Sequence, residues 1–186
     1  YEMTSSLVGS EMCIRDSYTP LRLANAMVSL FAPENIQTVL EPSCGDGVFL
    51  DSLFSVGLME QISMIQAIEI ESEEANKVAE RYKETKNVDV ICEDFFDFYQ
   101  RNYKSSQYDL ILGNPPYIRY QYLTEEQRKI QSNILTTHGM KANKLINAWV
   151  AFVVACVQML SENGKIAFVL PCLLYTSDAA DDLIGV

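Results

Sequence analysis

Residues 38–54 read TVLEPSCGDGVFLDSLF, and this stretch decides the fold. Its first four residues, 38–41, form a short apolar run that is typical of a buried strand. The glycines in the turn that follows, 42–47, let the backbone bend tightly. Apolar residues then recur at helical spacing through 48–54. The stretch therefore predicts a strand, a glycine turn and a helix in direct succession.

The same alternation of apolar strands and helical segments continues on both sides of this stretch. Further strands are predicted at 64–70, 88–92, 108–112 and 165–170, and helices at 71–83, 123–134 and 145–160. Strands that alternate with helices pair in parallel through crossover connections. The pattern thus predicts an α/β fold with a doubly wound, Rossmann-like sheet.

Polar clusters follow the ends of four predicted strands, at 41–47, 69–71, 93–95 and 113–117. In doubly wound sheets, ligands bind outside the carboxyl ends of the strands, at the point where the strand order reverses. We therefore expect the four clusters to converge on one crevice.

The glycine turn differs from a phosphate-binding loop, because no Lys-Ser/Thr pair follows its glycines and acidic residues flank it. A cationic ligand fits better. Glu41 is placed to pair with an ammonium group, and Glu69 to accept hydrogen bonds from the two hydroxyls of a ribose. A methionine moiety and a nucleoside together describe S-adenosylmethionine. Each glutamate alone is also compatible with a solvated carboxylate, and Gly45-Asp46-Gly47 with a simple turn.

Asp94 and Phe95 follow the third predicted strand. Asp94 can accept a hydrogen bond from the adenine amine of such a cofactor, and Phe95 can pack on its ring. The alternative is that Asp94 only caps the helix that follows.

The residues Asn114-Pro115-Pro116-Tyr117 give the most specific indication of chemistry. The exocyclic amine of adenine is a poor nucleophile because its lone pair is delocalised into the ring, so its methylation needs acceptors for both N–H groups. Asn114 offers its side-chain oxygen and Pro115 its backbone carbonyl, whose direction the locked proline φ angles fix. Tyr117 offers an aromatic face to a base extruded from the duplex. These features predict in-line methyl transfer driven by positioning and dipoles, and the alternative is a structural turn after a buried strand.

Bulk composition is that of one globular domain, with 48% hydrophobic and 21% charged residues. The longest apolar run, 146–160, is shorter than the roughly 20 residues that span a bilayer, so no membrane contact is predicted. Five cysteines without Cys-x-x-Cys spacing favour reduced thiols, a cytoplasmic location and no metal site.

The net charge of −11 disfavours nucleic acid as a ligand. Residues 101–144, however, carry 7 Lys and Arg against 3 Asp and Glu, a basic balance that fits either a polyanion contact or a solvated helix face.

The two ends, 1–17 and 172–186, differ in character from the rest of the chain. LVGSEMCIRDS at 7–17 resembles the translation of a sequencing-library adapter, and CLLYTSDAADD at 172–182 resembles the opposite adapter. Codons for the first, reverse-complemented and read one frame over, encode the CLLYT that opens the second. We therefore expect both ends to be adapter-derived extensions of an authentic segment, 18–171. The alternative is a genuine N-terminal arm and a genuine acidic tail.

These motifs resemble the gamma class of amino-type N6-adenine DNA methyltransferases, especially the catalytic halves of large restriction-modification enzymes. Tyr18-Thr19-Pro20 is similar to the first cofactor motif of that family, and EPSCGDGVF at 41–49 to its central one. The resemblance implies that S-adenosylmethionine is bound by Tyr18, Thr19, Pro20, Glu41, Pro42, Cys44, Gly45, Gly47, Glu69, Ile70, Asp94 and Phe95. It implies catalytic roles for Asn114, Pro115, Pro116 and Tyr117 on the N6 of a flipped adenine in double-stranded bacterial or archaeal DNA.

The chain departs from that family after its fifth predicted strand. Members have further strands and a separate target-recognition domain, so we expect 18–171 to be a truncated methyltransferase domain, with one sheet edge unpaired and no activity alone. A specificity domain and an endonuclease, fused or separate, are the expected partners within a restriction-modification or related defence system. Methylation of a protein glutamine amide or of an RNA amine, and an inactive cofactor-binding module, are the alternatives.

Overall fold

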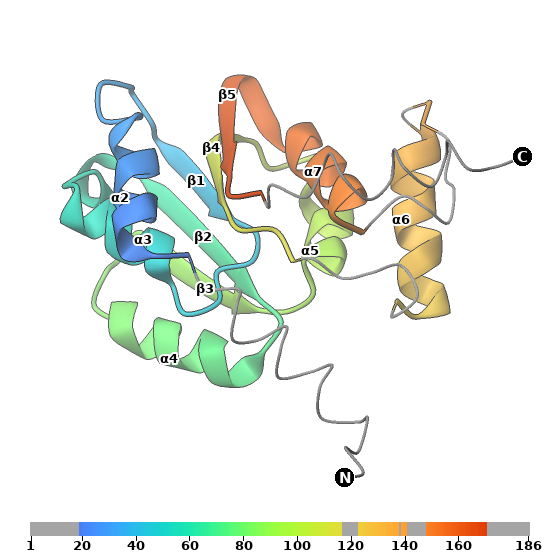
Figure 1. The fold of residues 1–186 in the computed structure, drawn as a ribbon, viewed down its shortest axis with the longest axis horizontal. Coiled ribbons are helices and arrows are strands. Elements are labelled where there is room, and N and C mark those ends of the chain that lie inside the picture. Colours follow the sequence, from blue (N-terminus) through green and yellow to red (C-terminus); the bar gives the residue numbers. More distant parts are fainter. Residues whose placement is uncertain (1–18, 117–122, 138, 141–147, 171–186) are drawn as a thin grey trace, which may run out of the picture.

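The computed structural model describes residues 19–116, 123–137, 139–140 and 148–170. Within them, five parallel strands form one sheet in the order β3-β2-β1-β4-β5 (Figure 1). The strands are β1 (Thr38–Glu41), β2 (Met64–Glu69), β3 (Val88–Cys92), β4 (Tyr108–Gly113) and β5 (Leu160–Phe168). The strand order reverses between β1 and β4, so the predicted doubly wound α/β sheet is confirmed.

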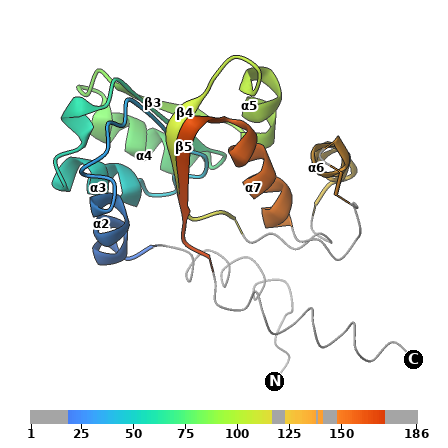
Figure 2. The same cartoon turned by 90° about the horizontal axis from the view of Figure 1, so that it is seen from above.

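Helices cover both faces of this sheet. They are α2 (Leu21–Ser29), α3 (Val48–Ser55), α4 (Ser72–Tyr82), α5 (Phe95–Asn102), α6 (Glu125–Thr137) and α7 (Ala148–Gln158), with a short 3-10 turn, η1 (Met59–Gln61). Neighbouring residues of one strand pack on opposite sides: Leu110 and Leu112 join the core under α2, α3 and α4, and Ile111 joins the core under α5 and α7. Figure 2 shows these two groups of helices on opposite sides of the sheet. This alternation follows from the pleat of a strand that is buried on both faces.

The start of β5 differs from the prediction. The pairing with β4 jumps from Tyr108 opposite Leu160 to Leu110 opposite Lys165, so the residues between Leu160 and Lys165 bulge out of the ladder. A Cβ at Gly164 would lie 2.6 Å from the carbonyl oxygen of Tyr108, which is why this bulge needs a glycine. The predicted turn before Lys165 is therefore a bulge within the strand.

The helices differ from the prediction at both ends: α6 runs three residues past its predicted end, to Thr137, and α7 ends two residues early, at Gln158. α6 begins after a capping box, in which the Thr124 amide donates to Gln127 Oε1 (3.0 Å) and the Gln127 amide donates to Thr124 Oγ1 (3.2 Å). α2 was not predicted, because its N-cap is Pro20, which offers no capping side chain. Residues 145–147 of the predicted last helix lie outside the described residues.

Among the described residues, no helix is both long and apolar enough to cross a bilayer. In the same part of the chain, His, Cys, Asp and Glu side chains form no group of three that could hold a metal ion. The cysteines described there, Cys44, Cys92 and Cys156, are free thiols.

Candidate functional site

A cavity of about 620 Å³ opens at the carboxyl ends of β1, β2, β3 and β4. Its lining includes residues from all four polar clusters, so the predicted convergence of these segments is confirmed as a structural fact. The predicted site residues that line it are Thr19, Glu41, Pro42, Cys44, Gly45, Glu69, Ile70, Asp94, Phe95, Asn114 and Pro116. Pro20, Gly47 and Pro115 lie next to lining residues without lining the cavity themselves. Tyr18 and Tyr117 lie outside the described residues.

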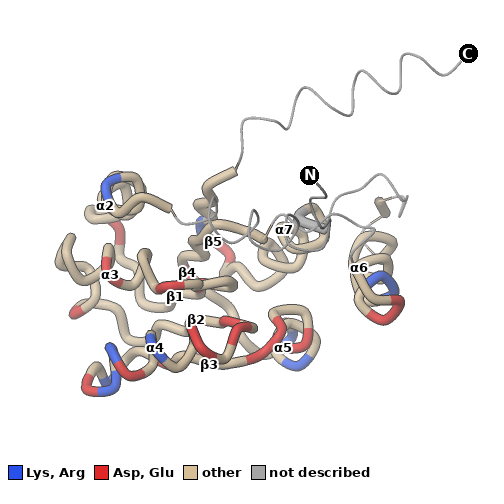
Figure 3. The backbone as a smooth tube through the Cα atoms, turned by 60° about the horizontal axis from the view of Figure 1, so that its bottom comes forward, with Lys and Arg blue, Asp and Glu red and all other residues tan. Residues whose placement is uncertain are grey.

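The cavity wall is strongly acidic. Among the described residues, its lining includes eight carboxylates and no Lys or Arg. They are Glu41, Asp46, Glu69, Glu71, Glu73, Glu74, Glu93 and Asp94. Figure 3 shows acidic positions gathered where β2 and β3 lead toward α5. Such a wall disfavours a phosphate ligand and favours a cation.

Glu41 lies at the end of β1 and is 1% exposed. Both of its carboxylate oxygens are buried without a hydrogen-bond partner among the described residues, although the side chain lines the cavity. Burial raises the pKa of Glu41 well above its ordinary value, and the nearby carboxylates of Asp46, Asp51 and Glu69 raise it further. A buried carboxylate without a partner is costly, so its environment favours a cationic group from a ligand.

Glu69 ends β2, and its carboxylate binds two backbone amides, one in the glycine turn and one just after the strand. Its Oε2 accepts a hydrogen bond from the Gly45 amide (2.7 Å), and its Oε1 accepts one from the Glu71 amide (2.8 Å). The residue is 8% exposed and lines the cavity. The sequence predicted a contact to ribose hydroxyls for this side chain. The structure adds a different contact, in which Glu69 orients the glycine turn.

Asp94 and Phe95 form the start of α5. Asp94 Oδ1 accepts a hydrogen bond from the Phe96 amide (2.7 Å), so the alternative of a helix cap is observed. The residue also lines the cavity, and the cap therefore fixes the side chain at the cavity wall. Phe95 packs against Phe152 of α7, with ring centroids 4.5 Å apart, and presents part of its surface to the same cavity.

The Asn114-Pro115-Pro116 segment leaves β4 beside the glycine turn. Ser43 Oγ donates a hydrogen bond to the Asn114 carbonyl oxygen (3.0 Å), which joins the two segments directly. Thr19 also reaches this cavity, and its hydroxyl oxygen is buried without a hydrogen-bond partner among the described residues. The structure thus places the predicted catalytic segment at the border of the acidic cavity.

Several lining residues were missed by reasoning from sequence. Leu123 lies just before α6, and Gln127 and the buried Gln131 lie on that helix. Gln127 and Gln131 are four residues apart, so the predicted helix at 123–134 could have shown that they share one helix face. Phe96 and Phe152 had no comparable signal, because each also reads as an ordinary core aromatic.

The glycine turn requires glycine at position 47, where φ is +81°. A Cβ there would lie 3.1 Å and 3.2 Å from the two methyl carbons of Val78 on α4. We expect Gly47→Ala to destabilise the fold by about 1–2 kcal/mol through backbone strain, plus the cost of displacing Val78. Gly57→Ala is the matched control, because Gly57 has φ +79° and no atom within 4 Å of an added Cβ. Denaturant unfolding of both variants checks this, and equal losses would contradict the role of the Val78 contact.

Comparisons with known proteins identify the family and the fold. Residues 34–183 match the family described as Eco57I restriction-modification methylase. The chain is 28% identical over 169 residues to the Type II methyltransferase M.HincII of Haemophilus influenzae, an alignment that covers 89% of this chain and 29% of that protein. The chain therefore spans less than a third of this relative.

Solved structures share the fold. The type I restriction-modification methyltransferase subunit of Streptococcus thermophilus superposes with a TM-score of 0.66 at 20% identity, covering 84% of this chain and 35% of that one. A Listeria monocytogenes protein described as a class I S-adenosylmethionine-dependent methyltransferase superposes with a TM-score of 0.62 at 11% identity, covering 88% and 48%. The cofactor expected from the sequence, S-adenosylmethionine, is the one that this fold and family imply. The chain belongs to the Eco57I restriction-modification methylase family and has the fold of the class I S-adenosylmethionine-dependent methyltransferases.

Proposed function

We propose that this chain forms the cofactor-binding and catalytic part of a DNA methyltransferase that modifies the N6 amine of adenine. The observation that carries the proposal is the buried Glu41 carboxylate, which has no hydrogen-bond partner among the described residues and lies in an acidic cavity that borders Asn114-Pro115-Pro116. In this cavity Glu41 suits a cation, and Asn114 offers an acceptor for an amine. A transferase that brings a sulfonium donor to an amine needs both.

S-adenosylmethionine fits the residues that are present. Glu41 suits the ammonium of its methionine moiety, and the Glu69 and Asp94 carboxylates suit the hydroxyls and the amine of its nucleoside, since each carboxylate oxygen accepts more than one hydrogen bond. Phe95 supplies an apolar surface beside them. When bound, the cofactor supplies an electrophilic methyl group. The carboxylates of the wall would then stabilise the positive charge of the ligand.

Asn114 and Pro115 would activate and orient the amine. Their oxygens would accept hydrogen bonds from the two N–H groups, which would draw lone-pair density back onto the nitrogen. The nitrogen lone pair would then form the new bond to the methyl carbon while the methyl–sulfur bond breaks and leaves a neutral thioether, and the methylated amine would give its surplus proton to water. Ser43 holds the Asn114 carbonyl and so limits the freedom of this segment relative to the glycine turn. Tyr117, as expected from the sequence, would stack on the extruded base. The chain's contribution is positioning and electrostatics.

The chain spans less than a third of its relative, so we propose DNA as the substrate of the full protein that contains this chain. We place recognition of the DNA sequence, and any associated endonuclease, outside residues 18–171. The protein would act on double-stranded DNA in the cytoplasm of a bacterium or archaeon.

Product analysis tests the proposal. The full gene product that contains this chain is incubated with isotopically labelled S-adenosylmethionine and DNA, RNA or protein, and the products are digested to nucleosides and amino acids. We expect label in N6-methyladenine from DNA. Label in RNA or in glutamine instead, or no transfer to any substrate, would overturn it.

A further inference from the structure

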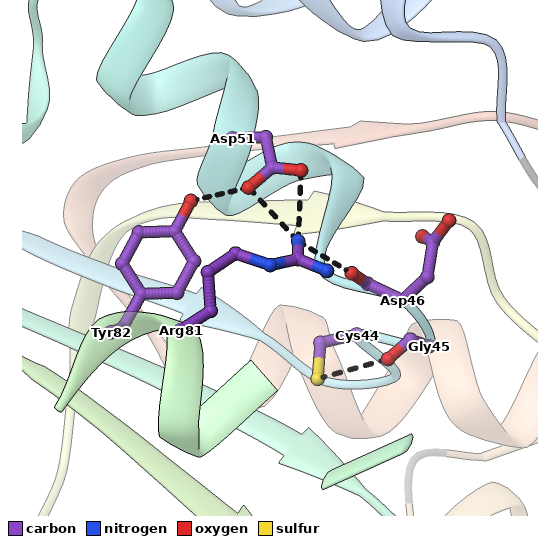
Figure 4. Close-up of polar contacts among 6 residues, drawn as sticks. All are labelled: Cys44, Gly45, Asp46, Asp51, Arg81 and Tyr82. Atoms are coloured by element: carbon purple, nitrogen blue, oxygen red, sulfur yellow. Dashed lines mark hydrogen bonds and ion pairs between the residues drawn. The ribbon is translucent and has the colours of Figure 1, made fainter. Parts of the chain in front are cut away.

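Arg81, on the last turn of α4, reaches across to the glycine turn. Its Nη1 donates hydrogen bonds to the Asp46 carbonyl oxygen (2.9 Å) and to both carboxylate oxygens of Asp51 (3.0 and 2.9 Å). Tyr82, the next residue, donates its hydroxyl to Asp51 Oδ1 (2.6 Å). Figure 4 shows these groups meeting beside the turn that joins β1 to α3.

The glycine turn is thereby held from two sides. On one side, the Glu69 carboxylate accepts the hydrogen bond from the Gly45 amide. On the other side, the guanidinium of Arg81 binds the carbonyl of the next residue, Asp46. The backbone has φ +52° at Gly45, between these two contacts, and +81° at Gly47, directly after them, angles at which glycine has little conformational preference of its own. Something other than local sterics must therefore select this shape.

Arg81 does not itself line the cavity, whereas Gly45 and Asp46 do. Its side chain is 43% exposed and that of Asp51 is 39% exposed, so their ion pair adds little to the stability of the fold. The hydrogen bond from Arg81 to the Asp46 carbonyl oxygen has a different effect, because it holds the backbone that forms the wall of the cavity. Removing it should alter the cavity more than it alters folding.

We infer that Arg81 is a positioning residue for cofactor binding, which acts by fixing the Asp46 carbonyl and so pre-forming the glycine turn that borders the ligand. Asp51 holds the guanidinium of Arg81 in place, and the Tyr82 hydroxyl in turn orients the Asp51 carboxylate. This inference rests on the proposed function, since it assigns the turn to cofactor contact. Pre-formed sites bind more tightly because less ordering is left to occur on binding.

Calorimetric titration of S-adenosylhomocysteine into the full chain tests the inference with three variants. Arg81→Ala is expected to raise the dissociation constant about tenfold, the equivalent of one hydrogen bond to a charged group. Arg81→Lys should recover part of the affinity, because an ammonium can still reach a carbonyl. Lys83→Ala is the matched control, since Lys83 directly follows the same helix and its ammonium forms an ion pair with the exposed Glu80.

A second readout separates positioning from folding. Amide exchange at Gly45 and Gly47 should accelerate in Arg81→Ala and stay unchanged in Lys83→Ala, while the unfolding midpoints of the two variants remain close. In the full gene product, KM for the cofactor should rise with little change in kcat at saturation.

The two proposals fail in different ways. If the wild-type chain does not bind S-adenosylhomocysteine, the proposed function is contradicted. If the wild type binds and the folded Arg81→Ala variant binds equally tightly, the positioning role is overturned and the cofactor site stands. Should Arg81→Ala fail to fold, Asp51→Asn takes its place, with a severalfold loss of affinity expected and no loss again overturning the role.

Discussion

Replacing Asn114 with alanine is expected to lower the rate of methyl transfer about 100- to 1,000-fold, the scale of losing one preorganised polar group at a reacting centre. The residue follows β4 and lines the cavity beside the glycine turn. Its side-chain oxygen is proposed to accept a hydrogen bond from the amine, so alanine leaves the lone pair delocalised into the ring. Cofactor affinity should change little, because the acidic wall is intact.

Single-turnover transfer by the full gene product measures this effect. Asn163→Ala is the matched control, because Asn163 is exposed in the bulge of β5 and lies outside the cavity lining. A wild-type rate in Asn114→Ala would remove the residue from the mechanism.

Substituting Glu41 with glutamine is expected to weaken binding of S-adenosylmethionine about 100-fold or more, since removing one partner of a buried ion pair costs roughly 3–5 kcal/mol. Glutamine keeps the size of the side chain and removes its charge. Isothermal titration compares it with Glu80→Gln, a change at an exposed carboxylate of α4. Equal affinity of wild type and Glu41→Gln would show that Glu41 does not meet a cation.

The same substitution should stabilise the ligand-free protein at neutral pH. Burial and the neighbouring Asp46, Asp51 and Glu69 raise the pKa of Glu41 in the folded state. A folded pKa above the unfolded value means that stability is greatest below the unfolded pKa and is lost as the pH rises through the folded one. Glutamine removes that loss, so the unfolding midpoint of Glu41→Gln should exceed that of the wild type.

Cofactor affinity should rise with pH, whereas the stability of the ligand-free protein falls with pH. Below the raised pKa of Glu41, the free site holds a proton that the cationic ligand must displace, so affinity rises with pH and levels off above that pKa. Binding should release a proton, which titrations in buffers of different ionisation enthalpy detect. In Glu41→Gln this pH dependence should disappear.

The part of the fold around the glycine turn was readable from the sequence. β1 and β3 have the predicted bounds, because short apolar runs end there at polar or glycine-rich segments. α2 was missed because it lacks a capping side chain, and its burial depends on packing against α3 and the sheet. β5 was misplaced at its start because a bulge leaves no periodic signal.

Part of the candidate site could also be predicted from the sequence. Strand-end residues such as Glu41 and Asn114 converge whenever parallel strands form one sheet, so the topology alone predicts their proximity. The roles of Glu69 and Arg81 in holding the turn were not predictable, because their hydrogen bonds go to backbone atoms of residues more than twenty positions away. Such contacts depend on how α4 and β2 are placed in three dimensions.

A crystal structure of the chain with S-adenosylhomocysteine tests the assignment of the cavity most directly. We predict the ligand in the cavity at the ends of β1, β2 and β3, with its ammonium within hydrogen-bond distance of Glu41 and its nucleoside between Glu69 and Asp94. A ligand bound elsewhere, or one in this cavity with its ammonium turned away from Glu41, would contradict it.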